Sequence, residues 1–236
     1  MRTALLITAA IAATAPLSAN LLTNGSFETV AAGCPSPGAG FYAVFPPPGI
    51  QCIPEWEVVS EDVHFVGTFW QAADGINSLD LDGNPGSSGG VRQSFATAPG
   101  HSYLLTFFMA GNPGNLPIIK PMRVSVDGQS TEFDFDTTGK SFTDMGWTQK
   151  NWSFVADDAI STLTFQSLTQ ERGLLQGWGP AIDNVTVTEV STVVPEPGTT
   201  WLVLPCGLIV LLLRIYATEG LGQPLCSNSQ AAGRHG

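Results

Sequence analysis

The stretch Ser78-Leu79-Asp80-Leu81-Asp82-Gly83 alternates leucine with aspartate and ends at a glycine. Because successive side chains of a β-strand point to opposite faces, it predicts a strand with leucines on a buried face and aspartates on a solvated face. A second alternating stretch, residues 122–136, is interrupted by a bend at Asp127-Gly128-Gln129, which is typical of a hairpin. Together these stretches predict antiparallel sheet.

Strand patterns also fill the sequence around these two stretches. They occupy residues 56–66, 90–97, 103–110, 147–155, 163–168 and 181–190. The run 103–110 is nearly all apolar, which predicts a strand buried on both faces. No stretch of helical periodicity precedes Thr199, and no glycine-rich phosphate loop opens a helix. About ten short strands separated by turns indicate an all-β sandwich or jelly roll.

Composition narrows the class of protein further. The 236 residues are 43% hydrophobic, which allows a substantial core, and only 12% charged, which is low for a soluble chain. Acidic residues outnumber basic ones by 20 to 9, for a net charge of -11. Binding to nucleic acid or to an anionic membrane surface requires clustered Lys and Arg, so both are disfavoured. The composition suits an exported all-β protein.

The first 19 residues have the pattern of a secretory signal peptide. Arg2 supplies the positive start, residues 4–13 are apolar, and Leu17-Ser18-Ala19 is a small-residue exit. An apolar core strand is the alternative, but the first acidic residue is Glu28. We expect residues 1–19 to be removed and the domain to begin at residue 20.

The C-terminal region has a second addressing pattern. Val194-Pro195-Glu196-Pro197 precedes an uncharged apolar run, residues 201–213, and Arg214 follows at once. The run is shorter than the roughly 20 residues that span a bilayer, unless flanking residues join it. We expect a short apolar helix within residues 193–216 and an unstructured tail over residues 217–236.

This arrangement resembles the PEP-CTERM sorting signal of some Gram-negative bacteria. The resemblance rests on Pro195, Glu196 and Pro197, the short hydrophobic segment, and Arg214. It implies transient anchoring in the inner membrane and processing by an exosortase, which leaves the protein at the cell surface or in the extracellular matrix. The chain departs from the pattern because it continues to Gly236 with one further cation, Arg234.

Two of the four cysteines bound a proline-rich loop. Cys34 and Cys52 enclose Pro46-Pro47-Pro48, and export would place both thiols in an oxidising compartment. A disulfide between them is the favoured interpretation, with two unpaired thiols as the alternative. No Cys-x-x-Cys pair occurs, which disfavours a zinc or iron–sulfur site.

The central region resembles the choice-of-anchor C family, whose domain is akin to domain of unknown function 642 of plant cell-wall proteins. Four stretches carry this resemblance: Asn20-Leu-Leu-Thr-Asn-Gly-Ser-Phe-Glu28, residues 67–83, Phe135-Asp-Thr-Thr-Gly-Lys140 and Gly179-Pro-Ala-Ile-Asp-Asn-Val185. The resemblance implies a galactose-binding-domain-like jelly-roll β-sandwich over residues 20–192. Folds of this kind are mostly carbohydrate-binding modules, although fold alone does not fix a ligand.

The same resemblance implies a structural calcium ion. In similar domains Ca²⁺ lies where the first strand meets the last, and Glu28 and Asp183 occupy the matching positions. Two carboxylates with backbone carbonyls would supply the oxygen ligands that Ca²⁺ takes. The alternative is that both residues cap turns in solvent. Asp80 and Asp82 are a weaker candidate pair, because outward aspartates on a strand are usually just solvated.

A sugar site needs an aromatic platform beside amide and carboxylate groups, because a pyranose stacks on rings while its hydroxyls need paired donors and acceptors. The predicted ligand-binding residues are Trp70, Gln71, Asp74 and Trp178. Most tryptophans of a sandwich lie in its core, and we expect this of Trp56, Trp147 and Trp152. The aromatic residues Phe41, Tyr42 and Phe45 form a third candidate cluster for sugar contact, for which a lid over the core is the favoured interpretation.

Catalysis is not expected. His64 and His101 are the only histidines of the domain, and no Gly-x-Ser-x-Gly nucleophile motif occurs. The favoured function is non-catalytic binding of a cell-surface or matrix polysaccharide. The alternatives are a structural matrix protein that binds no sugar and, less favoured, a glycoside hydrolase built on two of the many carboxylates.

Overall fold

The computed structural model describes residues 19–173 and 178–190, and all regular structure in these ranges is strand. The eleven strands are β1 (Phe41–Val44), β2 (Glu57–Val59), β3 (Val63–Val66), β4 (Ser78–Asp80), β5 (Gly90–Ala96), β6 (Ser102–Gly111), β7 (Ile119–Val126), β8 (Gln129–Asp136), β9 (Thr148–Val155), β10 (Ile160–Ser167) and β11 (Pro180–Glu189). The described residues include no helix long and apolar enough to cross a membrane. The predicted signal peptide, sorting motif, apolar helix and tail lie outside these residues, apart from Ala19.

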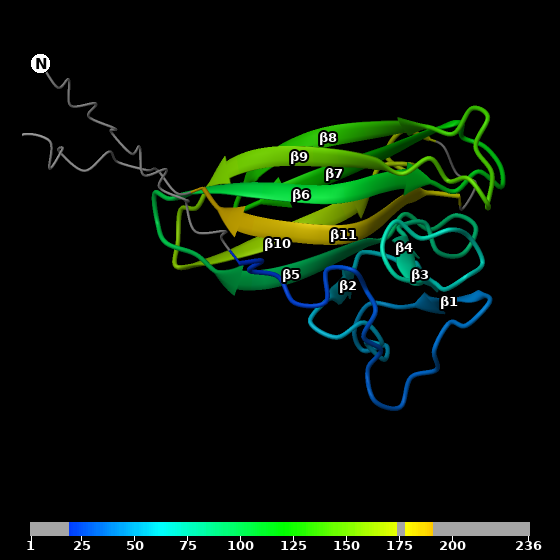
Figure 1. The fold of residues 1–236 in the computed structure, drawn as a ribbon, viewed down its shortest axis with the longest axis horizontal. Helices are drawn as coiled ribbons and strands as arrows, with labels where there is room; N and C mark the ends of the chain where they lie inside the picture. The colour runs from blue at the N-terminus through cyan, green and yellow to red at the C-terminus, as the bar shows by residue number, and fades with distance from the viewer. Residues whose placement is uncertain (1–18, 174–177, 191–236) are drawn as a thin grey trace, which may run out of the picture. The chain divides into compact units, whose positions relative to one another are not determined.

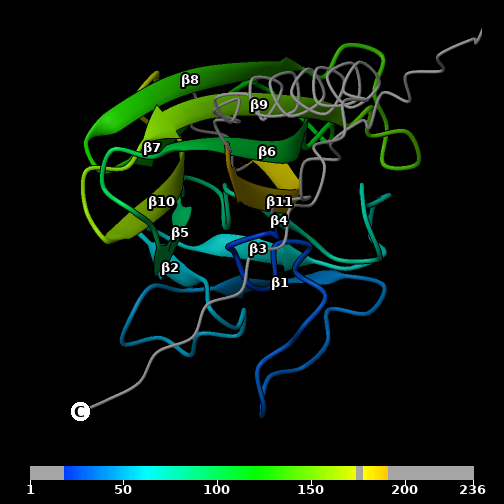
Figure 2. The same cartoon turned by 60° about the vertical axis from the view of Figure 1, so that its left-hand side comes forward.

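The strands form two antiparallel sheets, which confirms the predicted all-β jelly-roll sandwich. Sheet A has six strands in the order β1-β3-β4-β11-β6-β9, and sheet B has five in the order β2-β5-β10-β7-β8. Figures 1 and 2 show the long strands of both sheets lying together, with the short strands β1 to β4 gathered at one end. The non-sequential strand order brings residues far apart in the chain onto one sheet face.

The hydrophobic core lies between the sheets. In sheet A, the pairing of β3 with β4, β4 with β11 and β11 with β6 sets Phe65, Leu79, Ile182 and Met109 in one fully buried row. Phe165 of sheet B is buried in the same core. Burying a side chain of this size contributes about 1.5–3 kcal/mol. A one-residue slip of a strand would turn its buried side chains to the opposite face and lose this energy, so the inner layer fixes the register of both sheets.

The opposite face of sheet A carries a different set of residues. Since side chains alternate along a strand, the neighbours of the core row point away from the core. Strand pairing aligns His64, Asp80 and Ala181 in one outer row, and Phe41 aligns with Val66 in the next. The sheet therefore collects an imidazole, a carboxyl group and an aromatic ring on its outer face near the β1 edge.

The predicted hairpin is confirmed. Strands β7 and β8 pair over their whole length, with Val126 opposite Gln129. Asp127 and Gly128 connect them with φ values of 49° and 83°, which match a type I′ turn. Both turn positions need positive φ, which Asp tolerates and Gly adopts freely.

Two predicted strands differ from the structure. Residues 56–66 form two strands, β2 and β3, because Ser60 adopts a φ of 67° and the chain crosses from sheet B to sheet A. The run 103–110 is not buried on both faces: in β6 the inward side chains are buried, whereas Leu104, Thr106 and Phe108 are half-buried on the outer face. Apolar residues on that outer face hid the alternation in the sequence.

The segment 20–28 runs along β11 without forming a regular strand. The backbone N–H of Leu21 donates to the Val187 carbonyl oxygen at 2.9 Å, and the Val185 N–H donates to the Gly25 carbonyl oxygen at 2.9 Å. A Cβ atom at Gly25 would collide with the Val185 carbonyl, so this close approach requires glycine.

The predicted disulfide between Cys34 and Cys52 is present, with Cα atoms 5.6 Å apart. It closes the loop that contains β1, the edge strand of sheet A. In this way the covalent link restrains the strand that carries Phe41.

Candidate functional site

A hollow of about 250 Å³ lies over the outer face of sheet A, at the β1-β3-β4 edge. We call it the first hollow. The strands supply its base, and loops between strands supply its walls. Its lining residues are Phe41, His64, Val66, Phe69, Trp70, Asp80, Gly83, Asn84, Pro85, Asn112, Phe142 and Trp178. The site thus combines aromatic rings with amide, imidazole and carboxyl groups.

Aromatic side chains form one wall of the hollow. Phe69 lies with its ring centroid 5.0 Å from that of Phe41 and 4.9 Å from that of Phe142, and Phe41 lies 4.6 Å from the His64 ring. Phe69 is 38% exposed and Phe41 47% exposed. Exposed rings at such spacings form a continuous apolar surface that faces solvent, which is uncommon in a well-packed sandwich and often marks a binding site.

Asp80 lies at the base of the hollow and joins three segments of the chain. One carboxyl oxygen, Oδ1, accepts from the backbone N–H groups of Gly179 and Asp82, both at 3.1 Å. The other oxygen, Oδ2, accepts from Asn112 Nδ2 at 2.8 Å. Burial, followed by the charge of Asp82, raises the pKa of Asp80 to about 8. The group therefore holds the walls of the site in place.

The prediction that Asp80 and Asp82 face solvent is wrong. Asp80 is 1% exposed and Asp82 is fully buried, because loops cover this part of the outer sheet face and Gly179 packs against the Asp82 side chain. Both carboxyl oxygens of Asp82 lack a hydrogen-bond partner among the described residues. Burial raises the pKa of Asp82 to about 6. The alternating pattern gave the correct strand but not the covering loops.

Lys120 of β7 joins two loops of the site through its side chain. It is fully buried, and its Nζ atom donates to the carbonyl oxygens of Asn115 at 2.9 Å and Trp178 at 2.6 Å. Burial lowers the pKa of Lys120 to about 8, against the raising effect of Asp80 and Asp82. Sequence reasoning missed this residue, since nothing local marks a buried lysine.

The loop of residues 67–77 carries Phe69 and Trp70, and two carboxylates fasten it. Asp183 Oδ2 accepts from the N–H groups of Ala73 at 2.8 Å and Asp74 at 2.9 Å. Glu28 Oε1 accepts from the N–H groups of Ile76 at 2.8 Å and Asn77 at 2.7 Å. The predicted metal ligands thus hold one wall of the hollow.

A calcium ion at Glu28 and Asp183 would have to share these oxygens with backbone donors. Asp183 is fully buried, and Oδ1 also accepts from the Asn184 N–H at 2.6 Å. Among the described residues, no group of three His, Cys, Asp or Glu side chains is placed to hold a metal. Backbone carbonyls are further ligands that Ca²⁺ uses, so the calcium site stays a prediction.

The four predicted ligand-binding residues fall in different places. Trp70 and Trp178 both line the first hollow, although they lie more than a hundred positions apart. Trp70 is only 4% exposed, and its Nε1 donates to Ser78 Oγ at 2.7 Å. Gln71 lines a neighbouring hollow. Asp74 lines neither hollow and accepts a hydrogen bond from Ser26 at 2.8 Å.

Several lining residues were not predicted. Phe69 precedes Trp70 in the same loop and was not among the predicted ligand-binding residues. Phe142, Asn84 and Asn112 lie in three separate loops, so only the strand order brings them together. Phe41 was expected in a lid over the core, but it lines the hollow instead.

Of the expected core tryptophans, Trp56 is buried, whereas Trp147 and Trp152 are half-buried against the core.

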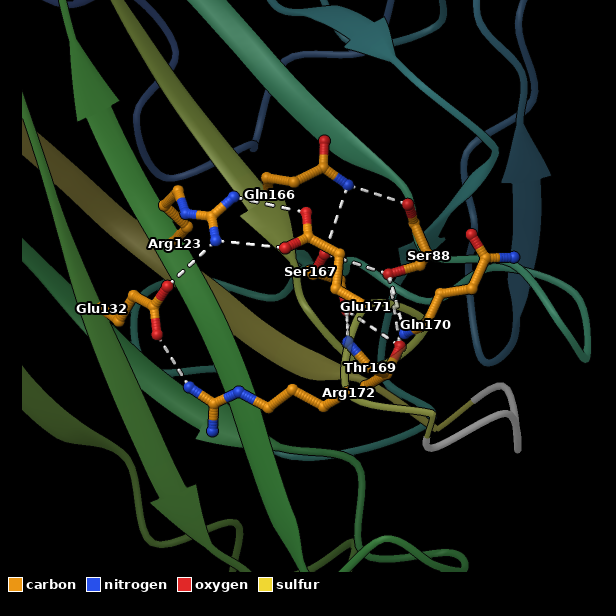
Figure 3. A network of polar contacts seen from close by, with 9 residues as sticks. All are labelled: Ser88, Arg123, Glu132, Gln166, Ser167, Thr169, Gln170, Glu171 and Arg172. Atoms are coloured by element: carbon orange, nitrogen blue, oxygen red, sulfur yellow. Dashed lines mark hydrogen bonds and ion pairs between the residues drawn. The ribbon is translucent and has the colours of Figure 1, made fainter. Parts of the chain in front are cut away.

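Ion pairs occupy the outer face of sheet B. Figure 3 shows Arg123 between Glu132 and Glu171, at 3.0 and 3.1 Å, and Arg172 paired with Glu132 at 2.9 Å. The two arginines lower the pKa of Glu132. Ser88, Gln166 and nearby polar residues continue the network, which fastens the turn after β10 to the sheet. Each of these exposed ion pairs contributes little to stability. Arg123 and Arg172 are thus engaged by carboxylates outside the first hollow, and neither lines it.

The histidines occupy different environments. Burial lowers the pKa of His64, which contacts Phe41 in the hollow. His101 is exposed, and its Nδ1 atom lies 2.6 Å from Glu189 Oε1. Of the described residues that line the first hollow, Asp80 is the only acidic one.

Fold and site together define a β-sandwich domain with an aromatic-lined hollow on one outer sheet face. The profile of a family described as protein of unknown function, DUF642, matches residues 20–188. The chain belongs to this family, which confirms that part of the resemblance found in the sequence.

One curated relative is halomucin of Haloquadratum walsbyi. It is 31% identical over 174 residues, which are 73% of this chain and 2% of halomucin. The chain thus spans a very small part of that relative.

Solved structures with a similar fold include carbohydrate-binding modules. TmCBM61, solved in complex with β-1,4-galactotriose, is 14% identical with a TM-score of 0.44, and the match covers 73% of this chain and 100% of that one. A family 35 module from Clostridium thermocellum is 15% identical with a TM-score of 0.39, covering 56% and 90%. Similarity of this size does not identify a ligand.

Proposed function

We propose that this protein binds carbohydrate without catalysis, through the first hollow. The observation that carries the proposal is the aromatic wall formed by the exposed rings of Phe41 and Phe69 and the half-buried ring of Phe142. This wall lies beside the amide groups of Asn84 and Asn112. The C–H face of a pyranose is apolar and stacks on such rings, whereas its hydroxyl groups require donors and acceptors close by.

The composition of the lining favours binding over hydrolysis. Glycoside hydrolysis by the usual mechanism needs two carboxyl groups flanking the scissile bond, about 5–9 Å apart. Among the described lining residues Asp80 is the only acid, and three hydrogen bonds already engage its oxygens. A passive site suits this arrangement better than a hydrolase does.

The proposal also covers the export and final location of the protein. We propose that residues 1–19 direct export and that a PEP-CTERM-type signal at Pro195, Glu196, Pro197 and Arg214 directs exosortase processing at the inner membrane. The disulfide between Cys34 and Cys52 supports an oxidising compartment. The mature protein would then act at the cell surface or in the extracellular matrix.

Sorting is tested separately from binding. Glu196→Ala in the native host should leave precursor with an uncleaved tail in the membrane fraction, detected by mass spectrometry of its C-terminus. Normal processing of that variant would contradict the assigned signal.

The binding proposal is tested with the purified protein on an array of neutral and acidic polysaccharides, followed by calorimetry on those retained. Phe69→Ala should weaken binding by about tenfold or more, as truncating an aromatic residue at the centre of a contact does. Ile160→Ala is the matched control, because Ile160 is an exposed apolar residue at the start of β10 in sheet B.

Binding to no polysaccharide at high micromolar protein would contradict the proposal and favour a structural matrix role. Equal binding by wild type and Phe69→Ala would place the sugar elsewhere. Turnover of chromogenic glycosides would favour the hydrolase.

A further inference from the structure

The first hollow has a neighbour on the far side of its aromatic wall. This second hollow has a volume of about 420 Å³. Phe69, Trp70 and Phe142 line both hollows, and we call these three residues the aromatic ridge. The remaining lining residues of the second hollow are Thr68, Gln71, Ala72, Gly75, Ile76 and Thr143. One set of rings therefore offers contact surface to both hollows.

Two hydrogen bonds to the backbone of Gln71 hold the ridge together. The N–H of Gln71 donates to the Phe142 carbonyl oxygen at 2.9 Å, and Trp147 Nε1 donates to the Gln71 carbonyl oxygen at 2.7 Å. These two bonds join the loop of Phe69 to the loop of Phe142. A ridge that is fixed before binding loses little conformational entropy when a ligand covers it.

The second hollow offers apolar surface and uncharged polar groups. Ile76 is 53% exposed, and Gln71 and Thr143 are also exposed. Gln71 joins the two loops through its backbone alone. Its side chain has no hydrogen-bond partner among the described residues and lines the second hollow. Its amide is free to donate to and accept from a ligand hydroxyl.

Charge narrows the class of ligand. Neither hollow is lined by Lys or Arg in the part of the chain that the structure describes, and Asp80 lies at the base of the first. The whole chain carries a net charge of -11. A uronate or sulfated polymer would find no cation to pair with here and would be repelled at long range.

We propose that the site binds an extended, neutral polysaccharide chain across the aromatic ridge, with consecutive sugar units in the two hollows. This inference rests on the proposed function and adds to it the length and charge of the ligand. It follows that affinity depends on chain length and that residues of the second hollow contribute only when a chain reaches them.

The test is calorimetry of the purified protein with neutral oligosaccharides of one to six units from β-1,4-galactan, β-1,4-xylan and β-1,4-glucan. Oligogalacturonides of the same lengths provide the charged series. For any neutral series that binds, affinity should rise at least about tenfold from one unit to four, as expected when a second contact is joined to the first.

The variant Gln71→Ala leaves the backbone bonds of the ridge in place. It should weaken binding of the four-unit chain about fivefold, the value of one lost hydrogen bond, and leave single-unit binding unchanged. Gln149→Ala on β9 is the matched control, because Gln149 is exposed and lines neither hollow.

Three results would overturn the inference, and each differs from failure of the proposed function. They are constant affinity from one unit to six, no effect of Gln71→Ala on the longer chains, and equal binding of oligogalacturonides. Absence of binding to every series and to the polysaccharide array would instead contradict carbohydrate binding itself.

Discussion

Replacing Asp82 by Asn tests whether a buried, unpartnered charge lies beneath the site. Asp82 is fully buried, neither of its carboxyl oxygens has a hydrogen-bond partner among the described residues, and burial raises its pKa from 3.8 to about 6. The charged groups that act on it are Lys120, which favours the ionised form, and Glu61, which disfavours it. The nearby hydroxyl groups of Ser167 and Thr169 also favour the ionised form, but burial outweighs them and Lys120, so ionisation costs stability.

The sign of the effect follows from linkage. A carboxyl group with a higher pKa in the folded state holds its proton more tightly when folded, so its favourable contribution is complete below about pH 4 and is lost as pH rises through about 6. A shift of about two pKa units corresponds to about 3 kcal/mol. Asp82→Asn carries no charge and should escape this loss.

The assay is thermal and urea unfolding of wild type and Asp82→Asn from pH 4 to pH 8. The two proteins should have similar stability at pH 4, and the variant should be more stable at pH 8 by up to about 3 kcal/mol, or about 6–12 °C in Tm. Comparing the difference removes the common contribution of Asp183, whose pKa is also raised. Asp80 does not cancel in the same way, because the charge of Asp82 helps to raise its pKa; the substitution removes that effect and so adds to the gain of the variant at high pH. A difference that does not change with pH would refute the reasoning.

Three further predictions concern the supports of the site. Cys34→Ser with Cys52→Ser should lower the free energy of unfolding by about 3 kcal/mol, measured in urea, because the disulfide closes a loop of 18 positions; an unchanged midpoint would show that the loop does not limit stability. A chelator should lower the Tm of wild type but not of Glu28→Ala or Asp183→Ala, and a wild-type Tm indifferent to chelator would count against calcium. Lys120→Met should cost about 2–4 kcal/mol, because the carbonyl oxygens of Asn115 and Trp178 lose a charged donor; a variant as stable as wild type would contradict this role of Lys120.

Local patterns were sufficient to predict the class of fold. Alternation in residues 122–136 and 78–83 reflects strand geometry, and Asp127-Gly128 reflects a turn that needs positive φ. The disulfide followed from two cysteines bounding one loop in a chain with an export pattern. Each of these features depends on neighbouring residues, so the sequence displays it directly.

The site was predicted only in part, because it depends on long-range pairing. Trp70 and Trp178 line one hollow as candidate sugar contacts, but the exposed rings are Phe69 and Phe41. Asp80 faces away from the core as predicted and is nevertheless buried, since loops from distant parts of the chain cover it. Loop coverage of an outer sheet face leaves no periodic signal in the sequence.

Spectroscopy of the indole N–H groups would locate the bound sugar directly. In a ¹H–¹⁵N spectrum of the purified protein, saturation with the best neutral oligosaccharide should shift the indole signal of Trp178, which lines the first hollow. The signal of Trp56 is an internal reference, because its Nε1 is buried and donates to the Asn24 carbonyl oxygen at 3.0 Å. A shift of Trp178 with Trp56 unchanged is the predicted result; a Trp178 signal that stays in place while sugar is bound would contradict a binding site in this hollow.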